Sequence, residues 1–326
     1  MIKENPSEGN DMSRRTFLGG MLGAGAMLGT PLSQLAEGVE PSQSGTPDVL
    51  KVCIFSKHLQ WLDYEGMAET AAEIGFDGVD LTVRPGGHVL PERVEEDLPK
   101  AIDAVNKAGI VAPMMTTAIT DPSNPLTEPL LRTASKLGIR FYRLGYYRYP
   151  DNKSIPGFLN EIKPMLRDLA AMNKQYGIHG DYQNHAGSKN VGAPIWDLWE
   201  LMRDIDSEWI GCQFDIRHAT VEGATAWPIS FRLMSPYIHT IVIKDFRWEK
   251  IKDDWKTVNC PLGEGMVDFT RFIGMWKQVG PQGPISMHFE YPLGGANSGK
   301  NQLTMEKEKV IRAMNRDRTI LKEWLK

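Results

Sequence analysis

The chain has 326 residues, and its 37 Lys and Arg against 41 Asp and Glu give a formal net charge of −4 at neutral pH. With 41% hydrophobic and 24% charged residues, the composition is that of a globular domain and excludes a disordered or collagen-like chain. The acidic balance argues against nucleic-acid binding, which needs an excess of Lys and Arg to offset phosphate charge. Three cysteines, Cys53, Cys212 and Cys260, are too few and too scattered for a disulfide framework or a thiolate zinc cluster.

The N-terminal segment has the pattern of an export signal. Residues 13–18 read Ser-Arg-Arg-Thr-Phe-Leu, and residues 19–28 are only Gly, Ala, Met and Leu. Paired arginines before such an apolar run resemble a twin-arginine signal. The run is too short to cross a bilayer, which needs about 20 apolar residues. We therefore expect a signal and flexible lead-in over residues 1–47, no stable membrane span, and a periplasmic or otherwise exported protein.

From residue 50 onward, short apolar runs alternate with amphipathic stretches. The predicted strands are residues 50–57, 78–84, 110–116, 140–146, 178–185, 210–215, 238–244 and 284–290. Helices are expected between them, for example over residues 65–74 and 154–176, where apolar side chains recur on one side. Interleaved strands and helices require parallel pairing and right-handed crossovers. Eight such units predict a (β/α)8 TIM barrel, a single α/β domain of residues 48–326.

An open doubly wound sheet is the alternative architecture. It is disfavoured because the first strand is followed by Phe55-Ser56-Lys57-His58 and not by a Gly-x-Gly-x-x-Gly turn. The longest gap between predicted elements, residues 247–264, contains Trp248 and Trp255 and is read as an insertion after the seventh strand. Long loops over a barrel mouth commonly act as lids or ligand walls.

Polar and ionisable side chains collect at the carboxyl ends of the predicted strands, where TIM barrels carry their active sites. These residues are Lys57 and His58, Arg84 and His88, Thr116 and Thr117, Tyr146 and Tyr147, Gln183 and His185, Asp215 and His218, Lys244 and Asp245, and Glu290. Two carboxylates on nearby strands, Asp215 and Glu290, repel unless a cation or a shared proton neutralises them. Oxygen and imidazole donors would suit Mn²⁺ or Mg²⁺. An ion-pair network with Lys244 or Arg84 is the alternative.

Other candidate residues point to structural roles. His239 and His288 lie in predicted strands, where single histidines are usually hydrogen-bonded structural groups. The turn at residues 84–88 has two adjacent glycines but no following Lys-Ser/Thr, so a tight turn that exposes His88 is favoured over a phosphate cradle. Glu264, between two glycines, is read as a solvated loop carboxylate.

Several segments together resemble a known family. They are residues 55–61 (FSKHLQW), 74–81 (IGFDGVDL), 184–185 (NH), 214–218 (FDIRH), 243–246 (IKDF), 262–265 (LGEG) and 289–291 (FEY). On these segments the chain, from residue 50 to about 325, is similar to the sugar phosphate isomerase/epimerase group with a xylose-isomerase-like TIM barrel. In that group a divalent ion is held by Glu on strand five, Asp on strand six, His on strand seven and Glu on strand eight.

The resemblance implies that Asp215 and Glu290 are metal ligands and that His218 contacts the substrate. The strand-five Glu falls on Gln183, which still offers an oxygen, and the strand-seven His falls on Val242, which cannot coordinate a metal. Because Gln183 cannot take a proton, the group's two-carboxylate proton shuttle is not available. A one-base scheme remains, in which Glu290 abstracts a proton next to a carbonyl and Lys244, His218 or a weakly held Mn²⁺ or Mg²⁺ stabilises the enolate.

The leading hypothesis is therefore a sugar isomerase or epimerase that moves a proton next to the carbonyl of a sugar or keto-sugar. Its catalytic residues are expected to be Glu290, Lys244 and His218, and its metal ligands Asp215, Glu290 and Gln183. The residues expected to bind the carbohydrate substrate are Lys57, Arg84, His88, His185 and Tyr147. A keto-sugar lyase or dehydratase and a non-catalytic carbohydrate-binding barrel are the alternatives. A metal-dependent phosphodiesterase is disfavoured by the charge of −4, and a homodimer is expected only because such barrels often pair.

Overall fold

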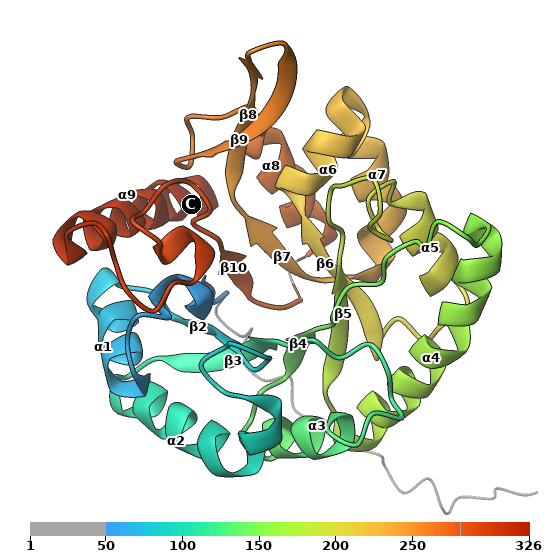
Figure 1. The fold of residues 1–326 in the computed structure, drawn as a ribbon, viewed down its shortest axis with the longest axis horizontal. Coiled ribbons are helices and arrows are strands. Elements are labelled where there is room, and N and C mark those ends of the chain that lie inside the picture. Colours follow the sequence, from blue (N-terminus) through green and yellow to red (C-terminus); the bar gives the residue numbers. More distant parts are fainter. Residues whose placement is uncertain (1–49, 281) are drawn as a thin grey trace, which may run out of the picture. The chain divides into compact units, whose positions relative to one another are not determined.

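A computed structural model of the chain describes residues 50–280 and 282–326. Within this part, eight parallel strands close into a barrel that helices surround (Figure 1). The neighbours around the barrel follow the order β1-β10-β7-β6-β5-β4-β3-β2. The predicted TIM barrel is therefore confirmed, and the open doubly wound sheet is wrong. The expected export signal in residues 1–47 lies outside the described residues.

Every predicted strand is present, most of them shorter than expected. The barrel strands are β1 (Val52–Phe55), β2 (Gly78–Thr82), β3 (Val111–Thr116), β4 (Phe141–Arg143), β5 (His179–Gln183), β6 (Ile210–Asp215), β7 (Ile238–Ile243) and β10 (Ile285–Met287). The α-helices are α1 (Tyr64–Ile74), α2 (Val94–Lys107), α3 (Thr127–Lys136), α4 (Ile155–Tyr176), α5 (Trp196–Met202), α6 (Ile216–Gly223), α7 (Trp227–Met234), α8 (Phe269–Val279) and α9 (Lys307–Leu325). No helix in the described part of the chain is long and apolar enough to cross a membrane.

The helix boundaries follow from local sequence signals. The Asp63 carboxylate accepts a hydrogen bond from the Gly66 backbone N–H at 2.9 Å and so caps the start of α1. Helix α1 ends at Gly75, whose φ of 93° is left-handed and is easily adopted only without a side chain. Gly177 ends α4 in the same way, with a φ of 61°. These stops turn the chain back to begin β2 and β5.

The barrel interior contains two buried carboxylates beneath the carboxyl ends of the strands. Asp181 of β5 accepts hydrogen bonds from Thr240 and from His239 Nδ1, at 2.6 and 2.7 Å. Asp80 of β2 accepts hydrogen bonds from the hydroxyl groups of Thr116 and Ser286, at 2.9 and 2.7 Å. Both carboxylates are satisfied, as buried polar groups must be. His239 is therefore a structural group, as expected from its position in a strand.

The expected insertion after the seventh strand is an antiparallel hairpin of β8 (Asp245–Ile251) and β9 (Asp254–Cys260). It projects outward at the rim of the barrel (Figure 1). The carboxylate of Asp245 holds its base by accepting hydrogen bonds from the backbone N–H groups of Gly263 and Gly265, at 3.0 and 2.9 Å. Trp248 and Trp255 are exposed on the hairpin, so the two indoles do not form a wall of the barrel mouth.

Candidate active site

A cavity of about 150 Å³ lies at the carboxyl ends of the barrel strands. It is lined by Phe55, Lys57, Arg84, Arg143, Tyr146, Gln183, His185, Lys244, His288 and Glu290. These residues come from the ends of six strands, which places side chains that are far apart in the sequence around one small space. Larger hollows occur elsewhere on the described surface, but they lack this concentration of ionisable groups.

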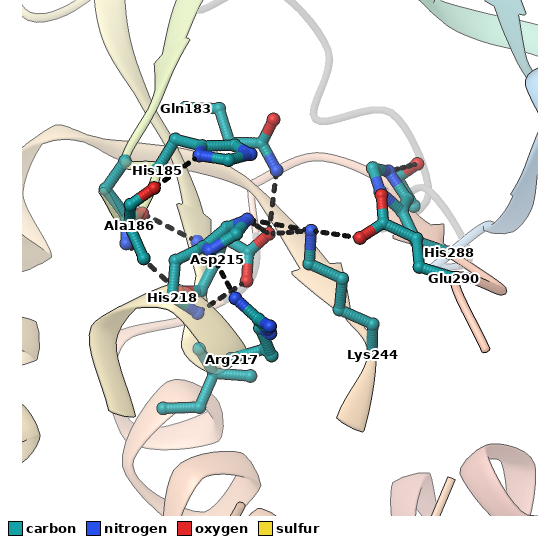
Figure 2. A network of polar contacts seen from close by, with 12 residues as sticks. Gln183, His185, Ala186, Asp215, Arg217, His218, Lys244, His288 and Glu290 are labelled. Carbon is teal, nitrogen blue, oxygen red and sulfur yellow. Dashed lines mark hydrogen bonds and ion pairs between the residues drawn. The ribbon is translucent and has the colours of Figure 1, made fainter. Parts of the chain in front are cut away.

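Lys244 is the centre of the polar network beside this cavity. Its Nζ lies 3.1 Å from Asp215 Oδ2, 3.3 Å from Glu290 Oε2 and 2.9 Å from His218 Nε2. Figure 2 shows the lysine reaching between Asp215 and His218 on one side and Glu290 on the other. The ion-pair network considered from the sequence is therefore present, and Lys244 is the cation that both carboxylates share.

The carboxylate of Asp215 is fixed on both sides. It stands at the end of β6, where its Oδ1 accepts a hydrogen bond from the His218 backbone N–H at 3.0 Å and caps α6. The Asn184 side chain bonds both the backbone N–H and the backbone carbonyl of Asp215, at 2.7 and 3.0 Å. Gln183 Nε2 donates to Oδ2 at 2.7 Å. Asp215 is completely buried, so it acts on the cavity through Lys244.

Glu290 is the carboxylate that reaches the cavity, with its side chain 23% exposed. Its Oε1 lies 3.4 Å from Lys57 Nζ and 3.8 Å from His288 Nδ1. Burial would raise the pKa of Glu290, but the charge of Lys244, the nearby imidazole of His288 and the charge of Lys57 hold it well below its usual value. Burial would likewise lower the pKa of Lys244, but the charges of Asp215 and Glu290 raise it. Glu290 is thus a carboxylate, and Lys244 an ammonium, at neutral pH.

Three histidines beside the network are uncharged. Burial, followed by the positive charge of Lys244, lowers the pKa of His218 well below its usual value and also lowers that of His185. Burial is the largest cause of the strongly lowered pKa of His288 as well. The imidazoles therefore offer lone pairs and N–H groups without adding positive charge.

The side chain of Gln183 has a fixed orientation. Its Oε1 accepts hydrogen bonds from Arg143 Nη1 at 3.0 Å and from the Tyr146 hydroxyl. Its Nε2 donates to Asp215, as described above. An amide flipped by 180° would face Arg143 with a donor and Asp215 with an acceptor, so neither contact would remain a hydrogen bond. The oxygen of Gln183 is thus turned toward Arg143.

These donors do not fit the divalent metal site expected from the family resemblance. The ammonium of Lys244 occupies the space between the carboxylates of Asp215 and Glu290, and the oxygen of Gln183 is held by Arg143. Val242 offers no ligand atom. Among residues 50–280 and 282–326, no group of three His, Cys, Asp or Glu side chains is arranged to hold a metal ion. The side chains at this position therefore suit an internal ammonium and not a divalent ion.

Most of the residues expected from the sequence do meet at the cavity. Lys57, Arg84, Gln183, His185, Lys244 and Glu290 line it, while Asp215 and His218 contact it through Lys244. Two expected substrate-binding residues lie elsewhere. Tyr147 stacks on Tyr182 with ring centroids 5.9 Å apart, and its hydroxyl donates to the carbonyl of Thr120. His88 is held by the hydroxyl groups of Ser56 and Thr82, each 3.2 Å from its Nδ1.

Four lining residues were not among the expected site residues: Phe55, Arg143, Tyr146 and His288. Tyr146 lines the cavity in place of Tyr147, because β4 ends at Arg143 and strand alternation no longer decides which tyrosine points inward. Arg143 itself carried a usable signal, since a charged residue inside a predicted barrel strand needs an internal partner. His288 shares a strand face with Glu290, and that spacing could have placed it in the site.

Glu264 lies outside the cavity lining. It is an outer-loop carboxylate, 3.1 Å from Arg316.

Comparisons with known proteins agree with this fold. The family model described as xylose isomerase-like TIM barrel matches residues 68–313. An uncharacterised protein of Methanocaldococcus jannaschii is 26% identical over 155 residues, which are 44% of this chain and 51% of that protein. The chain thus matches about half the length of this relative.

Solved structures are similar over most of the chain. A D-psicose 3-epimerase from Clostridium cellulolyticum H10 in complex with D-tagatose has a TM-score of 0.65 and 12% identity, over 85% of this chain and 100% of that one. The IOLI protein with a bound zinc atom has a TM-score of 0.66 and 13% identity, over 85% of this chain and 98% of that one. At such identities the likeness establishes the shared fold.

Proposed function

Since the chain belongs to the xylose isomerase-like TIM barrel family, we propose that it is a sugar isomerase or epimerase, which moves a proton at the carbon next to a carbonyl of a sugar or keto-sugar. One observation carries the proposal: a buried ammonium, Lys244, and a cavity-facing carboxylate, Glu290, lie 3.3 Å apart at the carboxyl end of the barrel. A base beside an electrophile is the pair that enolate formation requires. The structural likeness to a sugar epimerase supports the same class of reaction.

The chemical step follows from these two groups. Two of the three N–H groups of Lys244 face Asp215 and His218, and the third faces Glu290. The substrate carbonyl oxygen would replace Glu290 Oε2 as acceptor of this third N–H, while the released Glu290 oxygen removes the proton from the adjacent carbon. The C–H electron pair then forms the enolate double bond, and the carbonyl π electrons move to the oxygen beside the ammonium. Return of the proton to the former carbonyl carbon, with transfer of a hydroxyl proton between the two oxygens, gives isomerisation. Epimerisation would require a second proton donor on the opposite face of the enolate.

Lys244 takes the electrophilic role that the family resemblance gave to Mn²⁺ or Mg²⁺. A preorganised cation in a site of low dielectric stabilises developing negative charge without reorganisation during the reaction. His218, uncharged and 2.9 Å from Lys244 Nζ, holds the ammonium in position. Metal assistance by Asp215, Gln183 and Glu290 is not part of this proposal.

The test is exchange of substrate protons with solvent. Purified protein treated with a chelator is incubated in D₂O with a panel of aldoses, ketoses and 3-keto-sugars, and the sugars are followed by NMR. We expect deuterium at one carbon next to a carbonyl, together with an isomer or an epimer. Loss of a β-substituent would instead identify the keto-sugar lyase. Sugar binding with no exchange across the panel would refute the proposal and favour the non-catalytic carbohydrate-binding barrel.

We also propose that the protein is exported through its N-terminal twin-arginine pattern. Replacement of both Arg14 and Arg15 by Lys is expected to keep the chain in the cytoplasm when it is expressed in a bacterium with this export system. Cell fractionation of the two versions measures the effect. Equal amounts of both versions in the periplasm would contradict it.

A further inference from the structure

Two arginines at the cavity have no carboxylate partner among the described residues. Arg143 is only 5% exposed, and its two hydrogen bonds, to Gln183 Oε1 and the Tyr146 hydroxyl, are both made by Nη1 at 3.0 Å. Its Nε is buried and has no hydrogen-bond partner in the described structure. A buried charged group without a partner is costly. Arg143 lines the cavity, and its Nη2 makes no hydrogen bond to the described residues, so the Nη2 end of the guanidinium is the part that a ligand can reach.

Arg84 adds a second positive charge on the same cavity. Its guanidinium carbon lies 5.3 Å from the ring centroid of Phe55, and it forms no ion pair with any described carboxylate. Burial lowers the pKa of Arg84, and the positive charge of nearby Arg143 lowers it further. Two like charges brought together in a half-buried site indicate that something other than the protein neutralises them.

The remaining charges do not neutralise the two arginines. Lys57 and Lys244 are paired with Glu290, and Lys244 also with Asp215. The cavity is thus lined by four cations, Lys57, Arg84, Arg143 and Lys244, against the carboxylate of Glu290 and that of Asp215 behind Lys244. Asp80 lies nearby, but both of its oxygens accept hydrogen bonds from hydroxyl groups, and burial raises its pKa. The cavity therefore has an excess of positive charge.

We propose that the substrate carries a negatively charged group, a carboxylate or a phosphate, which Arg84 and Arg143 bind in the cavity that contains Lys244 and Glu290. The guanidinium groups of Arg84 and Arg143 both line the cavity, and their charged, planar N–H donors match the oxygens of either anion. The hydroxyl groups of an uncharged sugar cannot offset the excess charge. That the ligand is a sugar rests on the proposed function. The present inference adds that this sugar is an anion. Binding of the anion would hold the reacting carbon at a fixed distance from Glu290.

The test compares sugars that differ at one position. D-fructose, D-fructuronate and D-fructose 6-phosphate differ only in the group at C6, and matched five-carbon ketoses extend the set. Their affinities for the whole protein, treated with a chelator, are measured by isothermal titration calorimetry. We expect an anionic sugar to bind at least about tenfold more tightly than its neutral counterpart. If D-fructuronate gains more affinity over D-fructose than the phosphate ester does, the bound group is a carboxylate. If D-fructose 6-phosphate gains more, it is a phosphate.

Variants test whether the preference for anionic sugars depends on the two arginines. Arg84→Met and Arg143→Met are each expected to weaken binding of the anionic sugar about ten- to hundredfold, with little change in binding of the neutral sugar. Arg143→Lys, which keeps the charge and loses the planar guanidinium, should give an intermediate value. Arg148→Met is the matched control, because Arg148 is exposed on the same connection after β4 and does not line the cavity. A Tm close to that of the unaltered protein shows that a variant is folded.

The outcomes separate this inference from the proposed function. No preference for any anionic sugar, or an equal loss of neutral and anionic binding in the arginine variants, would overturn the anion site. Deuterium exchange into neutral sugars alone would do so as well, while leaving the proposed reaction intact. An anion preference that depends on both arginines, without any exchange, would support the anion site and refute the isomerase.

Discussion

The Nζ atom of Lys244 lies 3.1 Å from Oδ2 of Asp215, and both side chains are almost completely buried. The family resemblance places a metal ligand at this aspartate. Here the positive charge beside it belongs to the chain itself. Because the ammonium is covalently attached, its position is set by folding and not by the concentration of an ion. The same Nζ atom lies 3.3 Å from Oε2 of Glu290. A single ammonium thus pairs with the buried carboxylate of Asp215 and with the cavity-facing carboxylate of Glu290.

Replacement of Lys244 by Met should have two measurable effects. Proton exchange should fall about 10²- to 10³-fold, because the charge that stabilises the enolate is removed. Asp215 would then lack its counter-charge and Glu290 would keep only that of Lys57, so the variant should bind Mn²⁺ more tightly than the unaltered protein, as measured by electron paramagnetic resonance of free Mn²⁺. Lys57→Met is the control, since Lys57 contacts Glu290 but not Asp215. Tight binding of one Mn²⁺ by the unaltered chain, lost in Asp215→Ala, would contradict this account.

Asp215→Asn should destabilise the fold by about 3–5 kcal/mol, because it leaves a buried ammonium with only one carboxylate. Urea denaturation measures the free energy of unfolding. Asp151→Asn is the control, because its ion pair with Lys189 is exposed and such pairs contribute about 0–1 kcal/mol. The double variant Asp215→Asn, Lys244→Met should lose less than the sum of the single changes. Additive losses would show that the two side chains do not interact.

Gly265→Ala should loosen the base of the β8–β9 hairpin. A Cβ atom at this position would lie 2.1 Å from Oδ1 of Asp245, which must then move from the backbone N–H groups it binds. A loss of about 1–3 kcal/mol is expected, as for other overpacked sites. The measurements are the Tm and hydrogen exchange of residues 245–260. Gly274→Ala serves as control, since a Cβ in this helix meets open space and should be neutral or stabilising.

His239 should make stability depend on pH. Its two ring nitrogens lie 2.7 Å from Asp181 Oδ1 and 2.6 Å from the carbonyl of Ser207, and both partners are acceptors. Burial alone would lower the pKa of His239, but the charge and hydrogen bond of Asp181 raise it above its usual value. The imidazolium therefore stabilises the fold fully below the unfolded pKa of about 6.5, and this contribution is lost as pH rises through the folded pKa.

The measurement for His239 is the urea midpoint between pH 5 and pH 9. The difference between the unaltered protein and His239→Gln should be largest at pH 5 and should shrink as pH rises. Asp181 and Glu208 are the carboxylates whose negative charge acts on this ring. A difference that is constant with pH would show that His239 does not carry the proton.

The barrel could be predicted because its signals are local. Apolar runs of strand length, glycines such as Gly75 and Gly177 at helix ends, and polar residues after each strand are all readable in order. The partners across the cavity could not be predicted, since they depend on distances between strands. Lys244 was an expected catalytic residue, but its position between Asp215 and Glu290, where a metal was expected, emerges only from the closed barrel.

The errors in the site have similar causes. The choice between Tyr146 and Tyr147 depends on the backbone after β4, where the chain leaves the regular strand. His88 was expected at the mouth because its turn is rich in glycine. The hydroxyl groups of Ser56, just after β1, and of Thr82, at the end of β2, hold its ring outside the cavity lining. The lack of carboxylate partners for Arg84 and Arg143 could not be predicted either, because it depends on the positions of all neighbouring side chains.

The most direct measurement compares deuterium incorporation by the unaltered protein, Glu290→Gln and Glu264→Gln, with the sugar that shows exchange and with a chelator present. Glu264 is the matched control because it lies on an outer loop, paired with Arg316. We predict that Glu290→Gln still binds the sugar and loses exchange about 10²- to 10⁴-fold, the usual contribution of a general base. Glu264→Gln should exchange normally. Undiminished exchange in Glu290→Gln would contradict the assignment of Glu290 as the base.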